Sequence, residues 1–180
     1  LRLAQYIYSY PQNYDGLIID DVLNQAFYKF PNGNYVNTLQ VICAVVPDDG
    51  EFTIPETYNG AEITLSWGNF MSQVETLEVL NVSENLRALH GLSQSANIKA
   101  INFPENSKLI EMQALNYAGL NYLAPKGLTE ITLPKGTKTV GANAFADFHS
   151  NLTVHYPSTL NVHQTIIDKS NATWIPYDPS

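Results

Sequence analysis

The sequence lacks residues that several classes of protein require. It has one cysteine, Cys43, so no disulfide can form within the chain. It has nine Lys and Arg against seventeen Asp and Glu, a net charge of −8, and its cations form no basic run. Nucleic-acid phosphates and anionic lipid surfaces attract basic faces, so this charge argues against both as partners. No apolar stretch reaches the ~18 residues of a membrane span.

Common active-site motifs are missing as well. There is no Gly-rich phosphate loop and no nucleophile elbow. The four histidines, His90, His149, His155 and His163, are too far apart for a standard zinc spacing. The segment 48–51, DDGE, lacks the alternating oxygen ligands of a calcium loop and favours a plain acidic turn. We therefore predict a non-enzymatic protein with no metal and no cofactor.

Cys43 itself lies in the apolar run 41–46, VICAVV, which predicts a buried core thiol rather than a reactive one. The numbering starts at Leu1 rather than at a methionine. We therefore expect a mature or excised chain from which a signal peptide has been removed.

What the sequence does contain is a repeat. Residues 128–148 read LTEITLPKGTKTVGANAFADF, and the same pattern recurs imperfectly in 98–115, IKAINFPENSKLIEMQAL, and in 77–89, LEVLNVSENLRAL. The equivalent turn positions follow one another at steps of 28, 21, 30 and 23 residues: Pro55, Ser83, Pro104, Pro134 and Pro157. Self-similarity at about 20–30 residues is typical of a solenoid, in which each unit is buried by its neighbours.

Each unit predicts one short strand. Its last three apolar-polar-apolar residues alternate with the period of two that a strand requires, and a following proline ends the strand because it cannot donate to the ladder. Stacked units would place these strands in parallel along one face, with short helical turns and loops on the other side. Gly141 is expected to allow a sharp bend. The residues expected to point inward are Leu77, Leu80, Val82, Ile98, Ile101, Phe103, Leu128, Ile131 and Leu133.

The two ends of the chain lack this periodicity and are predicted to be caps. In the N-terminal cap, 1–50, the spacing of Val22, Leu23, Ala26, Phe27 and Phe30 after two aspartates predicts an amphipathic helix with an acidic start. A strand over 35–46 and a turn at 47–50 follow. In the C-terminal part, 159–169 is either a short helix or irregular, and 161–180 closes the last repeat.

The unit LTEITLP…TVGANAF at 128–148 resembles the BspA-like, or Treponema-type, leucine-rich repeat. The segment 52–60, FTIPETYNG, resembles the entry unit of that family, whose Tyr-Asn-Gly forms a turn, and 151–160, NLTVHYPSTL, resembles its exit strand. The unit at 98–115 departs from the pattern because Glu111 replaces a glycine, and the unit at 77–89 lacks the Ala-Phe pair.

The resemblance covers residues 51–160. It implies an α/β fold in the form of a short leucine-rich-repeat solenoid, with parallel strands on the concave face and non-repeat caps. It also implies a secreted or cell-surface bacterial protein, of a kind implicated in adhesion to host proteins or to other cells. No residue of the family defines a shared binding site.

Two outward columns of side chains can be aligned on the strand face. One contains Glu51, Val79, Ala100, Glu130 and Thr153, and the other contains Thr53, Asn81, Asn102, Thr132 and His155. The second column is uncharged and bears amide and hydroxyl groups, which suit hydrogen bonding to a peptide or a sugar. The alternative is a solvated sheet face whose polar residues only keep the array soluble. The candidate ligand-binding residues are therefore Glu51, Thr53, Asn81, Asn102, Glu130, Thr132, Thr153 and His155.

Three functions remain open at this point. The leading hypothesis is a monomeric extracellular or cell-surface module that recognises a protein or glycan through the strand face. The second is a structural spacer or assembly module of a larger surface protein, which a uniformly hydrated face would favour over an exposed apolar patch. The third is a carbohydrate-acting hydrolase that uses a pair such as Asp15 and Asp20, which requires one raised carboxyl pKa.

Overall fold

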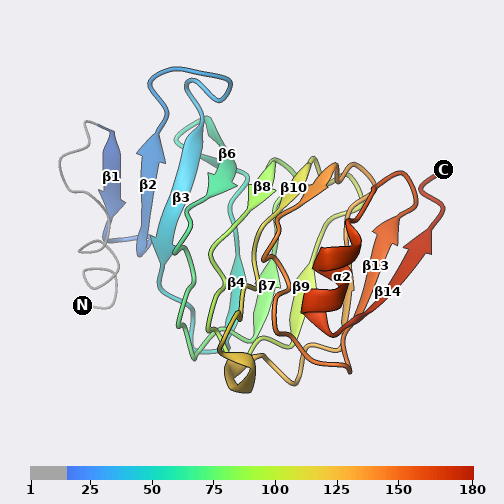
Figure 1. Ribbon diagram of the computed structural model, residues 1–180. Helices are drawn as coiled ribbons and strands as arrows, with labels where there is room; N and C mark the ends of the chain where they lie inside the picture. Colours follow the sequence, from blue (N-terminus) through green and yellow to red (C-terminus); the bar gives the residue numbers. More distant parts are fainter. Residues whose placement is uncertain (1–15) are drawn as a thin grey trace.

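The computed structural model describes residues 16–180, and Asp15 therefore lies outside the described residues. In this part of the chain the backbone winds as a β-solenoid of about six turns with parallel strands and little helix (Figure 1). The solenoid predicted from the repeat is thus confirmed. Its helical content is limited to the 3-10 turn η1, Asn121–Leu123, and the helix α2, Gln164–Ser170.

One side of the solenoid carries the short strands predicted from the repeats, and we call this side the strand face. Its strands form two three-stranded parallel blocks, β4-β7-β9 and β11-β13-β14. All the apolar positions predicted to point inward are buried, apart from Phe103, which is half-buried. The strands are β4 Glu51–Thr53, β7 Val79–Asn81, β9 Ala100–Asn102, β11 Glu130–Thr132, β13 Thr153–Pro157 and β14 Thr173–Tyr177.

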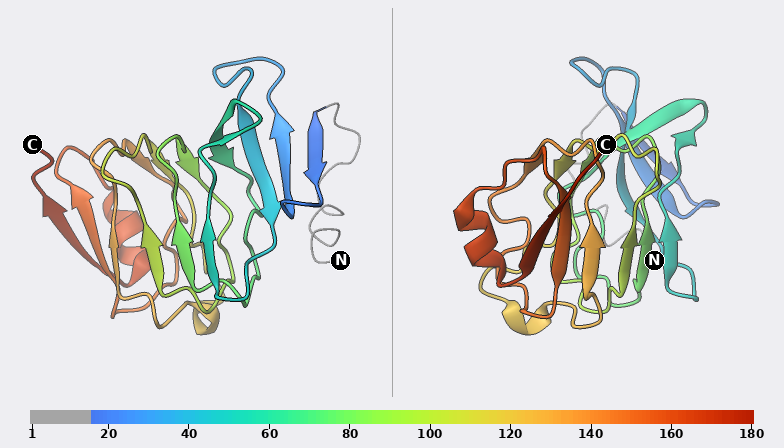
Figure 2. Two further views of the ribbon diagram at one scale, coloured as in Figure 1. Left: turned by 180° about the vertical axis from the view of Figure 1, so that it is seen from behind. Right: turned by 90° about the vertical axis from the view of Figure 1, so that its right-hand side faces the viewer.

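The opposite side is a second sheet, and the prediction of helical turns and loops there was wrong. Its parallel strands are β3 Leu39–Ala44, β6 Ala61–Ser66, β8 Ala88–Leu89, β10 Glu111–Met112 and β12 Thr139–Val140 (Figure 2). The reason is length, because a return segment of a few residues cannot complete a helix of typical length. Extended backbone instead pairs with the neighbouring turn, as in the hydrogen bond from Gly141 N to Met112 O, 2.9 Å.

The predicted N-terminal helix was also wrong. The segment is an antiparallel hairpin of β1, Leu17–Asp20, and β2, Gln25–Lys29, and β2 pairs antiparallel with β3. The reversal is made by Asp20, whose Oδ1 accepts from Leu23 N at 2.8 Å and from Val22 N at 3.0 Å. Asn24 has a left-handed φ of 55°. Aspartate and asparagine favour such turns over continuing helix because their side chains bond the local backbone.

Other local predictions were confirmed. The strand expected over 35–46 is present as the shorter β3, and the turn after it is closed by Gly50 N donating to Pro47 O at 3.0 Å. Asn59 and Gly60 have φ of 48° and 81° and join β5, Thr57–Tyr58, to β6 as a tight hairpin. Gly141 begins a turn, closed by Ala144 N donating to Gly141 O at 3.0 Å, and a Cβ there would also lie 2.8 Å from Gln113 Cγ.

The C-terminal cap contains α2 and β14, with β14 at the edge of its block. The Trp174 ring packs against Phe145 at a centroid distance of 5.3 Å and against Tyr156 at 5.9 Å. Its Nε1 donates to Ser170 Oγ at 2.8 Å. The last turn of the core is therefore covered by an aromatic side chain whose polar atom has a partner.

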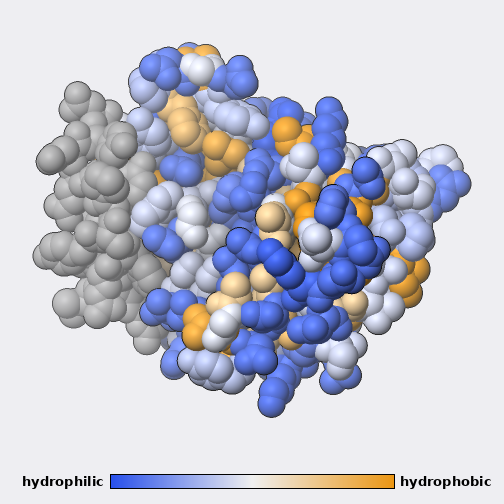
Figure 3. Space-filling model, viewed as in Figure 1, coloured by the Kyte–Doolittle hydropathy of each residue, from blue (hydrophilic) through white to orange (hydrophobic). Residues whose placement is uncertain are grey.

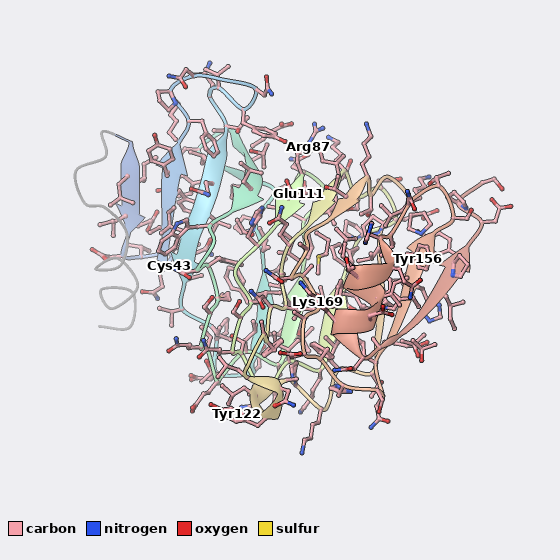
Figure 4. The ribbon with its side chains drawn as sticks, viewed as in Figure 1. Cys43, Arg87, Glu111, Tyr122, Tyr156 and Lys169 are labelled. Atoms are coloured by element: carbon pink, nitrogen blue, oxygen red, sulfur yellow. The ribbon has the colours of Figure 1, made fainter. Side chains whose placement is uncertain are left out.

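Cys43 is fully buried in β3 (Figure 4), as predicted. Burial raises the pKa of its thiol to about 12, so the reactive thiolate form is not populated at neutral pH.

Candidate ligand-binding face

The strand pairing confirms the two predicted side-chain columns within each block. In the first column, Val79 of β7 lies between its pairing partners Glu51 of β4 and Ala100 of β9. In the second column, Asn81 of β7 lies between Thr53 and Asn102 in the same way. In the second block Glu130 lies beside Thr153 and Thr132 lies beside His155. The side chains of Glu51, Thr53, Asn102, Glu130 and Thr132 are exposed, and Asn81, Thr153 and His155 are half-buried.

In the first block the polar side chains bond one another. Asn102 Nδ2 donates to Asn81 Oδ1 at 3.0 Å, and Asn81 Nδ2 donates to Glu51 Oε1 at 2.6 Å and to Thr53 Oγ1 at 3.2 Å. These groups form a chain of hydrogen bonds that runs across the strands. Part of the hydrogen-bonding capacity of these side chains is therefore used within the block.

The second block contains an imidazole–carboxylate pair. His155 Nε2 lies 2.9 Å from Glu130 Oε1, and their side chains are 28% and 71% exposed. With Glu130 mostly in solvent, this pair contributes at most about 1 kcal/mol to stability. Its effect on the site is to orient the Glu130 carboxylate at the border of the block.

The two blocks do not join, and sequence reasoning missed this. Among residues 16–180 no backbone hydrogen bond connects β9 to β11. Ala100 N donates to Glu78 O and Asn102 O accepts from Val82 N, so these two residues face β7. Because backbone groups along a parallel strand alternate between its two neighbours, the peptide groups of Ile101 face β11.

The facing edge of β11 is open in the same way. Leu133 N donates to His155 O, and Thr129 O accepts from Thr153 N. The backbone groups of Thr129 and Leu133 therefore face β13. By the same alternation the backbone groups of Glu130 and Thr132 face β9. We call this interval between β9 and β11 the ladder break. It is a place in the strand face where backbone donors and acceptors lack strand partners.

A depression of about 490 Å³ lies over the ladder break. Its floor is the two open strands, and one end is formed by the turns that begin at Pro104 and Pro134. Tyr177, Asp178 and Pro179 of the C-terminal segment form a wall. Tyr177 is held there because its hydroxyl donates to Leu133 O at 2.6 Å.

The side chains around this depression are acidic and aromatic. Glu105, Glu130 and Asp178 supply three carboxylates against the single ammonium of Lys135. Hydrogen bonds from Ser180 lower the pKa of Asp178, which keeps it ionised. Phe103 and Tyr177 are half-buried and present ring surface. Of the residues predicted from sequence, only Asn102, Glu130 and Thr132 line the depression.

Exposed apolar side chains are few on the strand face. The large hydrophobic residues exposed in the described part of the chain are Ile19, Val22, Leu23, Val36, Tyr122 and Ile175, and only Ile175 belongs to a strand of this face. Tyr122 projects from η1 at the lower border of the molecule (Figure 4). The side seen in Figure 3 is mostly hydrophilic, with small separate apolar patches.

Three further features of the described residues bear on other kinds of site. Within residues 16–180 no group of three His, Cys, Asp or Glu could hold a metal ion. The pKa of Asp20 is lowered, first by the hydrogen bond from Leu23 N and then by that from the Tyr58 hydroxyl, so Asp20 itself does not suit the role of general acid. Asp15, the other member of the predicted pair, lies outside the described residues. No helix in the described part of the chain is long and apolar enough to cross a membrane.

Comparison with known proteins identifies the class of fold. No protein-family model and no curated protein matches the chain significantly. A solved structure of a leucine rich cell surface protein from Faecalibacterium prausnitzii is similar to this chain, at 12% sequence identity and a TM-score of 0.50. The match covers 83% of this chain and 51% of the chain of that protein. The match with a leucine-rich repeat protein from Bacteroides ovatus covers 82% of this chain and 49% of that protein's chain, at 16% sequence identity and a TM-score of 0.46.

The fold is therefore that of a leucine-rich repeat solenoid, as the resemblance in the sequence predicted. At this level of identity the likeness concerns the fold alone. The chain spans about half the length of the solved structures it matches.

Proposed function

We propose that this chain is a non-enzymatic interaction module of a bacterial cell-surface or secreted protein, and that it binds a protein or glycan ligand through the strand face. The proposal is supported by the leucine-rich repeat fold and by the description of the Faecalibacterium prausnitzii neighbour as a cell surface protein. The observation that carries it is the depression over the ladder break, where open backbone groups, carboxylates and aromatic side chains converge.

A binding screen of the purified chain tests this function. The probes are purified extracellular matrix proteins and a glycan array, and the variant is the double substitution Asn102→Ala and Thr132→Ala. We expect a ligand that binds the wild type and loses at least about tenfold in affinity in the variant, since two hydrogen-bonding groups are removed. Circular dichroism and thermal unfolding check that the variant is folded. A ligand whose affinity the double variant leaves unchanged would place binding elsewhere.

The spacer hypothesis keeps one specific observation in its favour. The side chains of the first block bond one another, and the strand face carries little exposed apolar surface. If neither probe set binds the wild type, the chain serves to connect or display other parts of its parent protein. We expect a monomer, which sedimentation equilibrium would check.

A further inference from the structure

We propose that the ladder break binds a neutral saccharide, whose hydroxyls bridge the open edges of β9 and β11. This inference rests on the proposed function, and it names the class of ligand for the same face.

The first argument is the need of the open backbone groups for partners. The amide and carbonyl groups of Ile101, Glu130 and Thr132 face the break, so donors and acceptors alternate along both borders. Backbone polar groups are almost always paired in folded proteins, with water or ligand where protein is missing. A sugar hydroxyl donates and accepts at once, and it can therefore satisfy either kind of group from one position.

The second argument is spacing, which excludes the other ligand that open strand edges attract. An extended peptide inserted between two strands requires them to stand about 9.5 Å apart, twice the usual strand spacing. Cα atoms of β9 and β11 approach within 8 Å of one another. The two strands share no backbone hydrogen bond and stand too close for an added strand, so their open groups suit bridging hydroxyls and water.

The third argument is charge. Three carboxylates and one ammonium line the depression, in a chain whose net charge is −8. This field repels sulfated, phosphorylated and sialylated glycans. Carboxylates accept short hydrogen bonds from hydroxyl groups, which favours an uncharged polyol ligand.

The fourth argument is the aromatic and proline surface of the walls. The Tyr177 ring is anchored through its hydroxyl to Leu133 O, and Phe103 lies at the end of β9. Rigid rings bury apolar area at low entropy cost, and the C–H face of a sugar ring supplies such area. A protein partner is usually anchored by a cluster of exposed large apolar residues. Among the described residues, the strand face exposes only one such residue, Ile175.

The experiment uses the complete chain and an array of neutral oligosaccharides, together with sulfated and sialylated versions of the same sugars. Neutral oligosaccharides that bind are then titrated into ¹⁵N-labelled protein. We expect the amide signals of Ile101, Glu130 and Thr132 to shift on titration, while those of Val79 and Asn81 stay in place. Binding confined to the charged glycans would overturn the proposal.

Matched threonine variants locate the site. Thr132→Val removes an exposed hydroxyl at the break, and Thr139→Val removes one on the opposite sheet. Both threonines are strand residues, so valine preserves their shape. We expect Thr132→Val to weaken saccharide binding about 5-fold or more and Thr139→Val to leave it within about 2-fold. Equal losses in both would overturn the assignment to the break.

The two proposals fail in different ways. If no saccharide binds but a purified protein does, and the Asn102→Ala and Thr132→Ala variant loses it, the saccharide inference is wrong and the proposed function stands. If neither class binds, both are wrong.

Discussion

The Tyr58 hydroxyl donates a 2.7 Å hydrogen bond to Asp20 Oδ2, joining the N-terminal hairpin to the first repeat across 38 positions of sequence. The Tyr58 ring also stacks on Phe27 of β2 at a centroid distance of 4.4 Å. The Tyr-Asn-Gly hairpin of the first repeat is therefore also the contact that holds the N-terminal cap.

This contact makes stability depend on pH. The pKa of Asp20 is lowered from 3.8, first by the hydrogen bond from Leu23 N and next by that from the Tyr58 hydroxyl. Because the folded carboxyl is the stronger acid, its stabilisation is present above about pH 4 and is lost as the pH falls through the folded pKa. We expect Asp20→Asn to flatten the fall in unfolding free energy between about pH 5 and pH 2.

Urea unfolding at several pH values measures this difference. Asp21→Asn is the matched control, because it removes the same charge at the neighbouring position. If the two variants show the same pH profile, the hydrogen bonds of Asp20 do not stabilise the hairpin.

The ladder break predicts a local difference in hydrogen exchange. Val82 N and Leu133 N donate to Asn102 O and His155 O, each at 2.8 Å, whereas the amides of Ile101, Glu130 and Thr132 face the open interval. We expect the latter to exchange about tenfold faster or more, because no strand bond has to open first. Exchange followed by NMR at constant pH resolves each amide. Equal protection of both groups would mean that β9 and β11 are paired in solution.

Gly91 is predicted to be the glycine least tolerant of substitution. It has φ of 81°, and a Cβ there would lie 2.3 Å from Trp67 O and 2.4 Å from Phe70 N. Gly119 has φ of 74° but no atom within 4 Å of its added Cβ, so Gly119→Ala reports the backbone cost alone. We expect Gly119→Ala to cost about 1 kcal/mol and Gly91→Ala about 2 kcal/mol more.

Denaturant unfolding of the two variants provides the comparison. Similar losses would show that the chain relaxes around residue 91 at little cost.

Trp174 is predicted to seal the last turn of the core. Trp174→Ala removes its ring contacts with Phe145 and Tyr156, and we expect it to lower the unfolding free energy by about 2–3 kcal/mol, less than for a fully buried tryptophan. Tyr122→Ala is the control, since that ring is 72% exposed and its loss should change stability by about 0.5 kcal/mol or less. Thermal unfolding monitored by circular dichroism measures both. A Trp174→Ala variant as stable as the control would remove the capping role.

The repeat could be predicted from sequence because it depends on local spacing. The alternation in Glu130–Thr132 followed by Pro134, and its equivalents, predicts which side chains are buried whatever the neighbouring unit does. Once the units are aligned on their prolines, the columns through Asn81 and Asn102 follow, since parallel stacking repeats the same register.

The hairpin of β1 and β2 could not be predicted with the same rules. Val22, Leu23, Ala26 and Phe27 have helical spacing, and helix and strand compete over so short a segment. Pairing with β3 decides in favour of strand, and that partner is distant from the local pattern.

The candidate site, too, could be predicted from the sequence only in part. Sequence alone was enough to specify the solenoid, its buried positions and the polar character of the strand face, because a half-buried strand has a period of two wherever it lies. The ladder break, the second sheet and the wall built by Tyr177 were decided only by the tertiary structure. Each depends on which backbone edges meet, and hydrogen bonds between strands from different turns leave no periodic signal in any one of them.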